Sequence, residues 1–239
     1  MKAKKAIIIG ASSGIGKELA IQLSRRGYEI GLTARRTLLL KKIQSELPGK
    51  SYIATMDVSE PQKSRLILKK LIDRMGKVDL IVINAGLGIK NPNWRNELEI
   101  VQTNVNGFTA LANFAYHYFS RNGGGCLAGV SSIAGIRGSR QATAYSASKA
   151  FMSNYMEGLR MKARKERSNV NVMDVIPGFV ETEMTKGLTY KFWVSKPDKA
   201  CIQIIRSLKK NHRKAFVTRK WTIVARIYKH MPEWLLSRL

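Results

Sequence analysis

The stretch Lys5-Ala6-Ile7-Ile8-Ile9-Gly10-Ala11-Ser12-Ser13-Gly14-Ile15-Gly16 decides the fold of this 239-residue chain. The apolar run before Gly10 is short and rich in Ile, which is typical of a buried parallel strand. The residues that follow Gly16, Lys17–Leu23, have the apolar spacing of a helix. A glycine-rich loop alone can be an ordinary tight turn, but a strand, such a loop and a helix in this order let the backbone approach a pyrophosphate. The stretch therefore predicts a nucleotide-binding α/β fold.

Tyr145 and Lys149 carry the clearest chemical signal further along the chain. A spacing of four residues places the phenol and the ammonium on one face of a helix. A nearby positive charge favours phenolate, so the pKa of Tyr145 is expected to fall below its usual value of about 10. Ser131-Ser132 lies upstream, after an apolar run, and offers hydroxyl groups that can hold a substrate oxygen. Because Tyr–Lys pairs also occur by chance on solvated helices, this pair needs support from other motifs.

That support comes from a family resemblance. The glycine-rich stretch and the Tyr–Lys pair, with Asn84-Ala85-Gly86 and Asn104 between them, resemble the short-chain dehydrogenase/reductase family from Lys4 to about Thr185. The resemblance implies a catalytic set of Asn104, Ser132, Tyr145 and Lys149. It also implies that the glycine loop holds the cofactor diphosphate, that Asp57-Val58 contacts adenine, and that Pro177–Thr182 lies along the nicotinamide.

The end of the second expected strand bears on the choice of cofactor. An acidic residue there would accept the ribose hydroxyl of NAD, whereas this chain has Arg35 and Arg36. Arg35 can form a bidentate pair with a 2′-phosphate. Arg36 can contribute to the same phosphate site or simply begin a surface helix, and the sequence favours neither. We therefore expect NADP(H), and no metal. The expected cofactor contacts are Gly10, Ser12, Ser13, Gly14, Ile15, Gly16, Arg35, Arg36, Asp57, Val58, Asn84, Ala85, Gly86, Tyr145, Lys149, Pro177, Gly178, Val180 and Thr182.

Strand and helix patterns alternate throughout, which indicates one α/β domain with a doubly wound parallel sheet of the Rossmann type, about seven strands and helices on both faces. The expected strands are Lys5–Ile9, Tyr28–Thr33, Ser51–Met56, Leu80–Ile83, Cys126–Val130, Val170–Ile176 and Ala215–Thr218. We divide the chain into a catalytic domain, residues 1–219, and an amphipathic C-terminal segment, residues 220–239. The two longest expected helices are Trp94–Phe119 and Thr143–Lys165. The resemblance implies that these helices pack against their copies in a partner subunit, so that the protein is a homodimer or homotetramer.

Charge is the unusual feature of the composition. The chain has 42 Lys/Arg and 16 Asp/Glu, a net charge of +26. Such a charge attracts polyanions in general, although a solvated basic surface explains it equally well, and no nucleic-acid-binding motif accompanies it. Two cysteines give no disulfide framework, and no apolar run has the length of about 20 residues that a membrane span needs. The expected compartment is the cytoplasm, with contact at a membrane periphery left open.

The substrate is the part of the predicted function that the sequence determines least. Met184, Leu188, Tyr190, Phe192 and Trp193 are expected to line an apolar pocket for a lipophilic ketone or aldehyde. The same motifs also suit a 3-oxoacyl-carrier-protein reductase, whose acidic partner a basic surface could dock. A third possibility, from another class, is a non-catalytic NADP(H)-binding sensor or scaffold, but the complete Ser-Tyr-Lys set favours an enzyme.

The C-terminal segment has its own pattern. Apolar residues recur at helical spacing at Trp221, Val224, Ile227, Tyr228, Met231, Leu235 and Leu239. Basic residues border this stripe, and Pro232 is expected to break the helix. The pattern suits an anionic membrane surface, and it suits packing over the substrate pocket or onto a neighbouring subunit as well.

Overall fold

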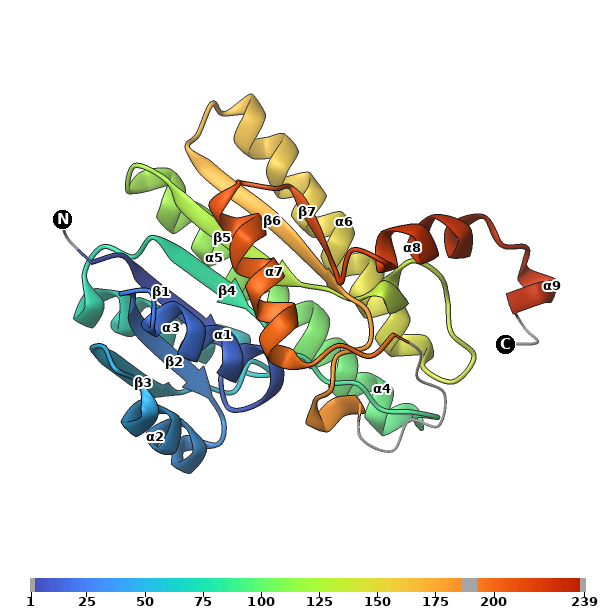
Figure 1. The fold of residues 1–239 in the computed structure, drawn as a ribbon, viewed down its shortest axis with the longest axis horizontal. Helices are drawn as coiled ribbons and strands as arrows, with labels where there is room; N and C mark the ends of the chain where they lie inside the picture. Colours follow the sequence, from blue (N-terminus) through green and yellow to red (C-terminus); the bar gives the residue numbers. More distant parts are fainter. Residues whose placement is uncertain (1–2, 186–192, 237–239) are drawn as a thin grey trace.

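The computed structural model describes residues 3–185 and 193–236, in which strands and helices alternate along the chain (Figure 1). The strands of this part form one parallel sheet in the order β3-β2-β1-β4-β5-β6-β7. They are β1 (Lys5–Ile9), β2 (Glu29–Ala34), β3 (Ser51–Thr55), β4 (Leu80–Ile83), β5 (Gly125–Val130), β6 (Val170–Pro177) and β7 (Lys214–Val217). The predicted doubly wound fold is confirmed.

Helices cover both faces of the sheet (Figure 1). On one face, α1 (Gly14–Ser24), α2 (Thr37–Glu46) and α7 (Pro197–Lys209) contribute to one hydrophobic cluster. On the other face, α3 (Pro61–Met75), α5 (Phe108–Arg121) and α6 (Thr143–Lys165) contribute to a second. Side chains of β1 alternate between them, because successive residues of a strand point to opposite faces: Ile8 joins the first cluster, and Ile7 and Ile9 join the second. This double burial explains why the strand is an uninterrupted apolar run.

The long helix expected at Trp94–Phe119 is not regular. The structure has α4 (Trp94–Val101), then a π-helical segment (Gln102–Gly107), then α5. This segment passes very close to the loop between β3 and α3, since a Cβ on Gly107 would lie 2.0 Å from the carbonyl oxygen of Val58. Wider helical turns of this kind are often found at functional sites. The expectation of one continuous helix is therefore wrong at Asn104, which lies inside the π-helical segment.

The C-terminal segment begins with α8 (Trp221–His230), and α9 (Glu233–Leu236) follows after the expected break at Pro232. Trp221 is only 2% exposed. Its ring packs against Phe179 and occupies the space where a Cβ on Gly178 would lie. Trp221 and Ile227 belong to the same predicted apolar stripe, but tertiary packing draws only the start of α8 into the fold and leaves Ile227 59% exposed. Leu239 lies outside the described residues, and the boundary after residue 219 stays a prediction.

Candidate functional site

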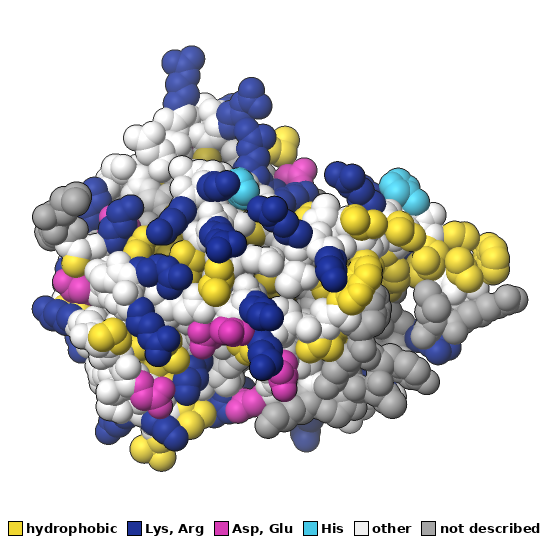
Figure 2. All heavy atoms as spheres, in the orientation of Figure 1, with side chains coloured by type: hydrophobic (Ala, Val, Ile, Leu, Met, Phe, Trp, Pro, Cys, Tyr) yellow, Lys and Arg dark blue, Asp and Glu magenta, His cyan; other side chains and the backbone are white. Residues whose placement is uncertain are grey.

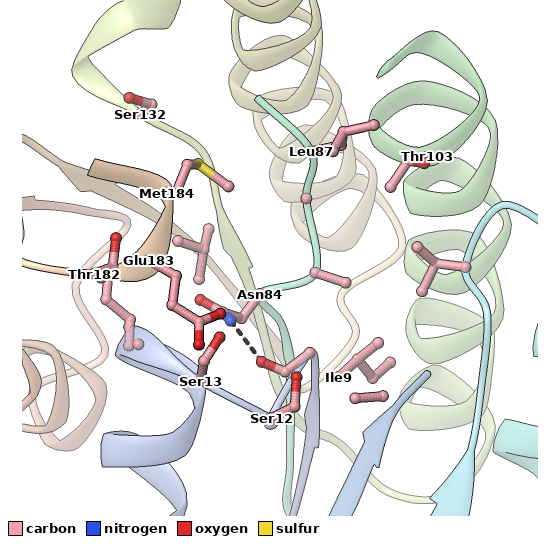
Figure 3. Close-up of a pocket in the computed structure, with 18 of the residues that line it drawn as sticks. Ile9, Ser12, Ser13, Asn84, Leu87, Thr103, Ser132, Thr182, Glu183 and Met184 are labelled. Atoms are coloured by element: carbon pink, nitrogen blue, oxygen red, sulfur yellow. Dashed lines mark hydrogen bonds between the residues drawn. The ribbon is translucent and has the colours of Figure 1, made fainter. Parts of the chain in front are cut away.

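A cleft of about 440 Å³ opens at the carboxyl ends of the central strands. This is where the strand order reverses, since β1 lies between β2 and β4. All of the predicted catalytic and cofactor-contact residues line this cleft, except Gly16 and Asn104. Figure 3 shows Ser12, Ser13 and Asn84 on its floor, with side chains from several segments directed toward the same space.

The glycine loop leaves no room for side chains at two positions. A Cβ on Gly10, whose φ is +87°, would lie 2.6 Å from the backbone nitrogen of Ala85. A Cβ on Gly16 would lie 2.1 Å from the carbonyl oxygen of Gly10. That oxygen already accepts a hydrogen bond of 2.8 Å from Nδ2 of Asn84, drawn as a dashed line in Figure 3. This hydrogen bond from Asn84 therefore connects the glycine loop to the end of β4.

Helix α1 follows the glycine loop directly, and its N-terminus faces the cleft. Ser13 precedes the helix with extended backbone geometry and makes no side-chain capping hydrogen bond. The first N–H groups of a helix lack partners within the helix and carry its positive dipole end, which suits an anion. Together, the crowded glycine cradle and this helix end fit the diphosphate of a dinucleotide.

Lys149 is nearly buried on α6, with 4% of its surface exposed. Its Nζ donates a 2.9 Å hydrogen bond to the carbonyl oxygen of Val130 at the end of β5 and lies 5.8 Å from the centre of the Tyr145 ring. Burial lowers the pKa of Lys149 to about 8, and the negative charge of Asp174 opposes this shift. The ammonium is thus held in place by the sheet and is easier to deprotonate than an ordinary lysine.

The pKa of Tyr145 differs from the sequence-based prediction. Burial raises the pKa of its phenol above the usual value, and interaction with the Ser132 hydroxyl offsets part of that rise. Its hydroxyl lies 3.9 Å from Sδ of Met184, a weak acceptor. The predicted lowering of the Tyr145 pKa is therefore wrong in this structure, because loss of water around the phenol is the largest effect on its pKa.

The two serines after β5 have separate surroundings. Ser132 lies at the start of a short 3₁₀ helix (Ile133–Gly135), where its Oγ accepts a 3.2 Å hydrogen bond from the backbone nitrogen of Ala134. Ser131 is buried, and its Oγ donates a 2.6 Å hydrogen bond to Oδ1 of Asp174. Both line the cleft, but the Ser131 hydroxyl is engaged in the sheet. This arrangement favours Ser132 as the hydroxyl that meets a ligand.

Asn104 is fully buried behind the cleft. Its Nδ2 donates to the carbonyl oxygen of Leu87 at 2.8 Å and to Oγ of Ser148 at 3.0 Å, and its Oδ1 accepts from the nitrogen of Leu87 at 2.8 Å. A Cβ on Gly86 would lie 3.4 Å from Asn104 Oδ1 and 3.2 Å from Lys149 Nζ. Asn104 therefore joins the loop after β4 to α6, directly behind the lysine.

The two arginines after β2 both line the cleft and are both exposed. Arg36 donates from Nη2 to the hydroxyls of Ser12 (2.9 Å) and Ser13 (2.8 Å), and from Nη1 to Glu183 Oε2 at 3.0 Å. The sequence pattern favoured Arg35 for a phosphate, whereas the structure brings Arg36 onto the glycine loop. Glu183 was missed, because nothing in the Pro177–Thr182 motif marks the residue that follows it.

Other cleft residues were only partly anticipated. Leu87 and Thr103 line the cleft without any sequence signal, and Figure 3 shows them apart from Ser132 and Met184. Met184 lines it as expected, while Leu188, Tyr190 and Phe192 lie outside the described residues. The prediction is wrong for Trp193, which does not line the cleft because its ring packs edge-on against Trp221. Within residues 3–185 and 193–236, no three His, Cys, Asp or Glu side chains gather into a metal-binding group. None of the helices described is long and apolar enough to cross a membrane.

Known proteins that are similar to this chain are oxidoreductases. The family model described as short chain dehydrogenase matches residues 4–191. An uncharacterized oxidoreductase of Myxococcus xanthus is 36% identical over 192 residues, which cover 77% of this chain and 75% of that protein. A 3-oxoacyl-[acyl-carrier-protein] reductase of Bos taurus is 28% identical over 189 residues, 77% of this chain and 79% of that one.

Solved structures share the fold at low sequence identity. A short-chain dehydrogenase from Sphingobium yanoikuyae in complex with NADPH has a TM-score of 0.79 at 19% identity and covers 96% of this chain and 97% of its own. A short chain dehydrogenase/reductase from Burkholderia phymatum in complex with NAD has a TM-score of 0.84 at 18% identity, with coverage of 95% and 92%. Proteins of this fold thus bind either nicotinamide cofactor.

Proposed function

The chain belongs to the short-chain dehydrogenase/reductase family, and we propose that it uses NADP(H) to interconvert a carbonyl and an alcohol on a small lipophilic substrate. The observation that carries this proposal is the meeting of Ser132, Tyr145 and Lys149 with the glycine loop in one cleft. The crowded loop and the N-terminus of α1 suit the cofactor diphosphate. Met184 adds an apolar contact near the Tyr145 hydroxyl.

In reduction, the bound cofactor supplies a hydride to the carbonyl carbon. Ser132 orients the carbonyl oxygen, and Tyr145 donates a proton to it. A raised pKa keeps the Tyr145 phenol protonated at neutral pH, which is the form that proton donation requires. The ammonium of Lys149, 5.8 Å from the ring centre, stabilises the phenolate that remains. The family resemblance suggests two further roles. Lys149 would bind the nicotinamide ribose, and Asn104 would hold a water molecule that links Lys149 to solvent.

NADP(H) is proposed over NAD(H) because two cations and no acid follow β2. Arg35 and Arg36 both line the cleft, and Arg36 reaches the hydroxyls of Ser12 and Ser13 on the glycine loop. A 2′-phosphate at this position would be met by two guanidinium groups. Because cells keep NADP mainly reduced, carbonyl reduction is the proposed direction.

We expect the wild type to bind NADPH more tightly than NADH, and Arg35→Asp to narrow or invert that difference. The substitution removes one guanidinium and adds a charge that repels the 2′-phosphate. Fluorescence titration with both cofactors measures the change. Lys42→Asp, on α2 just after Arg35 but outside the cleft-lining residues, is the matched control for net charge. Equal affinities of the wild type for the two cofactors would contradict the proposal.

The reaction itself is tested by following NADPH oxidation with a panel of ketones and aldehydes of increasing apolar size. Turnover that rises with apolar size is expected from an apolar substrate pocket. Tight NADPH binding without turnover of any compound would point instead to a sensor or scaffold.

A second candidate is reduction of a 3-oxoacyl group on an acidic carrier protein. It is favoured by the 28% identity to the bovine 3-oxoacyl-[acyl-carrier-protein] reductase and by the net charge of +26. The two candidates separate when a 3-oxoacyl thioester is offered free and on a carrier protein. A carrier-dependent gain in kcat/KM that disappears in high salt would support the second candidate.

We further propose that the protein is at least a dimer, formed through α4 and α6. These helices pack on each other, and their outer sides expose Trp94 (73%), Leu98 (48%), Val101 (41%) and Phe151 (36%). Large apolar side chains gathered on neighbouring helices are typical of a protein–protein interface.

Leu98→Asp combined with Phe151→Asp is expected to convert the assembly to monomers, because each substitution buries an unpaired carboxylate in the interface. Analytical ultracentrifugation at micromolar concentration measures the mass. Leu38→Asp, at a position on α2 that is 81% exposed, should leave the mass unchanged. A wild-type protein that sediments as a monomer would contradict this proposal.

A further inference from the structure

The two faces of α8 have different surroundings. Trp221 and Ala225 are buried against the body of the protein, at 2% and 5% exposure. Ile223 and Ile227, also four residues apart, are 64% and 59% exposed, so they lie together on the opposite face. Trp234 on α9 is 62% exposed. One face thus fixes the helix to the fold, and the other presents large apolar side chains outward.

Basic side chains border these exposed apolar residues. At about 100° per residue, Lys220, Arg226 and His230 fall on either side of the line from Ile223 to Ile227. Arg226 and His230 are exposed, and the Nζ of Lys220 lies 5.6 Å from the centre of the Trp193 ring. We call this the α8–α9 surface; its members are Lys220, Ile223, Arg226, Ile227, His230 and Trp234.

The sequence through α7, β7 and α8 is strongly basic, and Glu233 at the start of α9 is the first acidic residue after it. Residues 199–232 contain ten Lys or Arg and no Asp or Glu. Figure 2 shows Lys and Arg side chains over the region of α7 and hydrophobic side chains over the region of α8. A second copy of this chain would bring the same cations against its own, which opposes self-association through this surface. An anionic surface complements it.

We propose that the α8–α9 surface docks the protein onto an anionic lipid membrane. Ile223, Ile227 and Trp234 enter the boundary between head groups and acyl chains, and the basic residues contact lipid phosphates and carboxylates. This is the arrangement of an interfacial amphipathic helix, in which apolar burial and attraction to anionic lipid act together. The body of the protein holds α8 in place through Trp221, so no folding of the helix is required on binding.

The test is sedimentation of the full chain with vesicles of phosphatidylcholine alone and of phosphatidylcholine with phosphatidylserine. Binding to the anionic vesicles, lost at high salt, is the expected result. Ile223→Ser with Ile227→Ser, and separately Lys220→Glu with Arg226→Glu, should each lower the partition coefficient at least about tenfold. Leu38→Ser and Lys42→Glu, exposed positions on α2, should each leave it unchanged.

Thermal unfolding of each variant checks that the fold is retained, and the charge pair tests the proposal independently if the isoleucine pair fails to fold. The proposal is overturned by equal binding to both kinds of vesicle, by no binding at low salt, or by variants that bind like the wild type. A fall in sedimenting mass of the isoleucine variant without any vesicle binding would instead identify an interface between copies.

Discussion

Tyr145→Phe is expected to lower kcat for carbonyl reduction by a factor of about 10² or more while NADPH still binds. The substitution removes the proposed proton donor and keeps the ring that lines the cleft. Stopped-flow or steady-state NADPH oxidation measures kcat, and fluorescence titration measures cofactor affinity.

Tyr155→Phe is the matched control. Tyr155 lies on the same helix, where its ring packs on Phe108 and Phe151 outside the cleft-lining residues. Its loss should leave kcat near the wild-type value. If Tyr145→Phe retained a near-normal kcat, the catalytic assignment would be wrong, and the Tyr–Lys pair would have only a structural role.

Gly16→Ala is expected to weaken NADPH binding by about 10- to 100-fold, because the loop and the helix must approach each other too closely for any side chain. The added Cβ would lie 2.1 Å from the carbonyl oxygen of Gly10 and 2.6 Å from Nδ2 of Asn84, so the bond between these two groups must break or the loop must move. Fluorescence titration with NADPH gives the affinity.

Gly158→Ala is the control for this change. It also replaces a helical glycine, but on α6, where a Cβ would meet no atom within 4 Å. Alanine there is expected to raise the free energy of unfolding by about 0.5–1 kcal/mol and to leave cofactor affinity unchanged. Undiminished NADPH binding by Gly16→Ala would show that the cofactor does not use this loop.

Tertiary structure decided which of several similar residues face the site. Arg35 and Arg36 are adjacent in a basic stretch, and only the fold shows that Arg36 reaches Ser12, Ser13 and Glu183. Trp221 and Ile227 fall in one periodic stripe of the sequence, yet one is 2% exposed and the other 59%. Local spacing cannot separate such neighbours, because their burial depends on segments that are distant in the chain.

Local sequence patterns were sufficient to predict the sheet and most of the catalytic and cofactor-contact residues of the cleft. Uninterrupted apolar runs between turn residues marked β1 and β4, since a strand covered on both faces has no polar side to hide the signal. The order of the motifs then placed the glycine loop, Asn84, Ser132 and Tyr145 at one edge, because parallel strands all end there. The sequence could not determine pKa values or local helix geometry, because both depend on the complete tertiary structure. The pKa of Tyr145 rises where its pairing with Lys149 suggested a fall, and the helix at Asn104 widens. Both depend on desolvation and close packing among residues far apart in the chain, which no local pattern records.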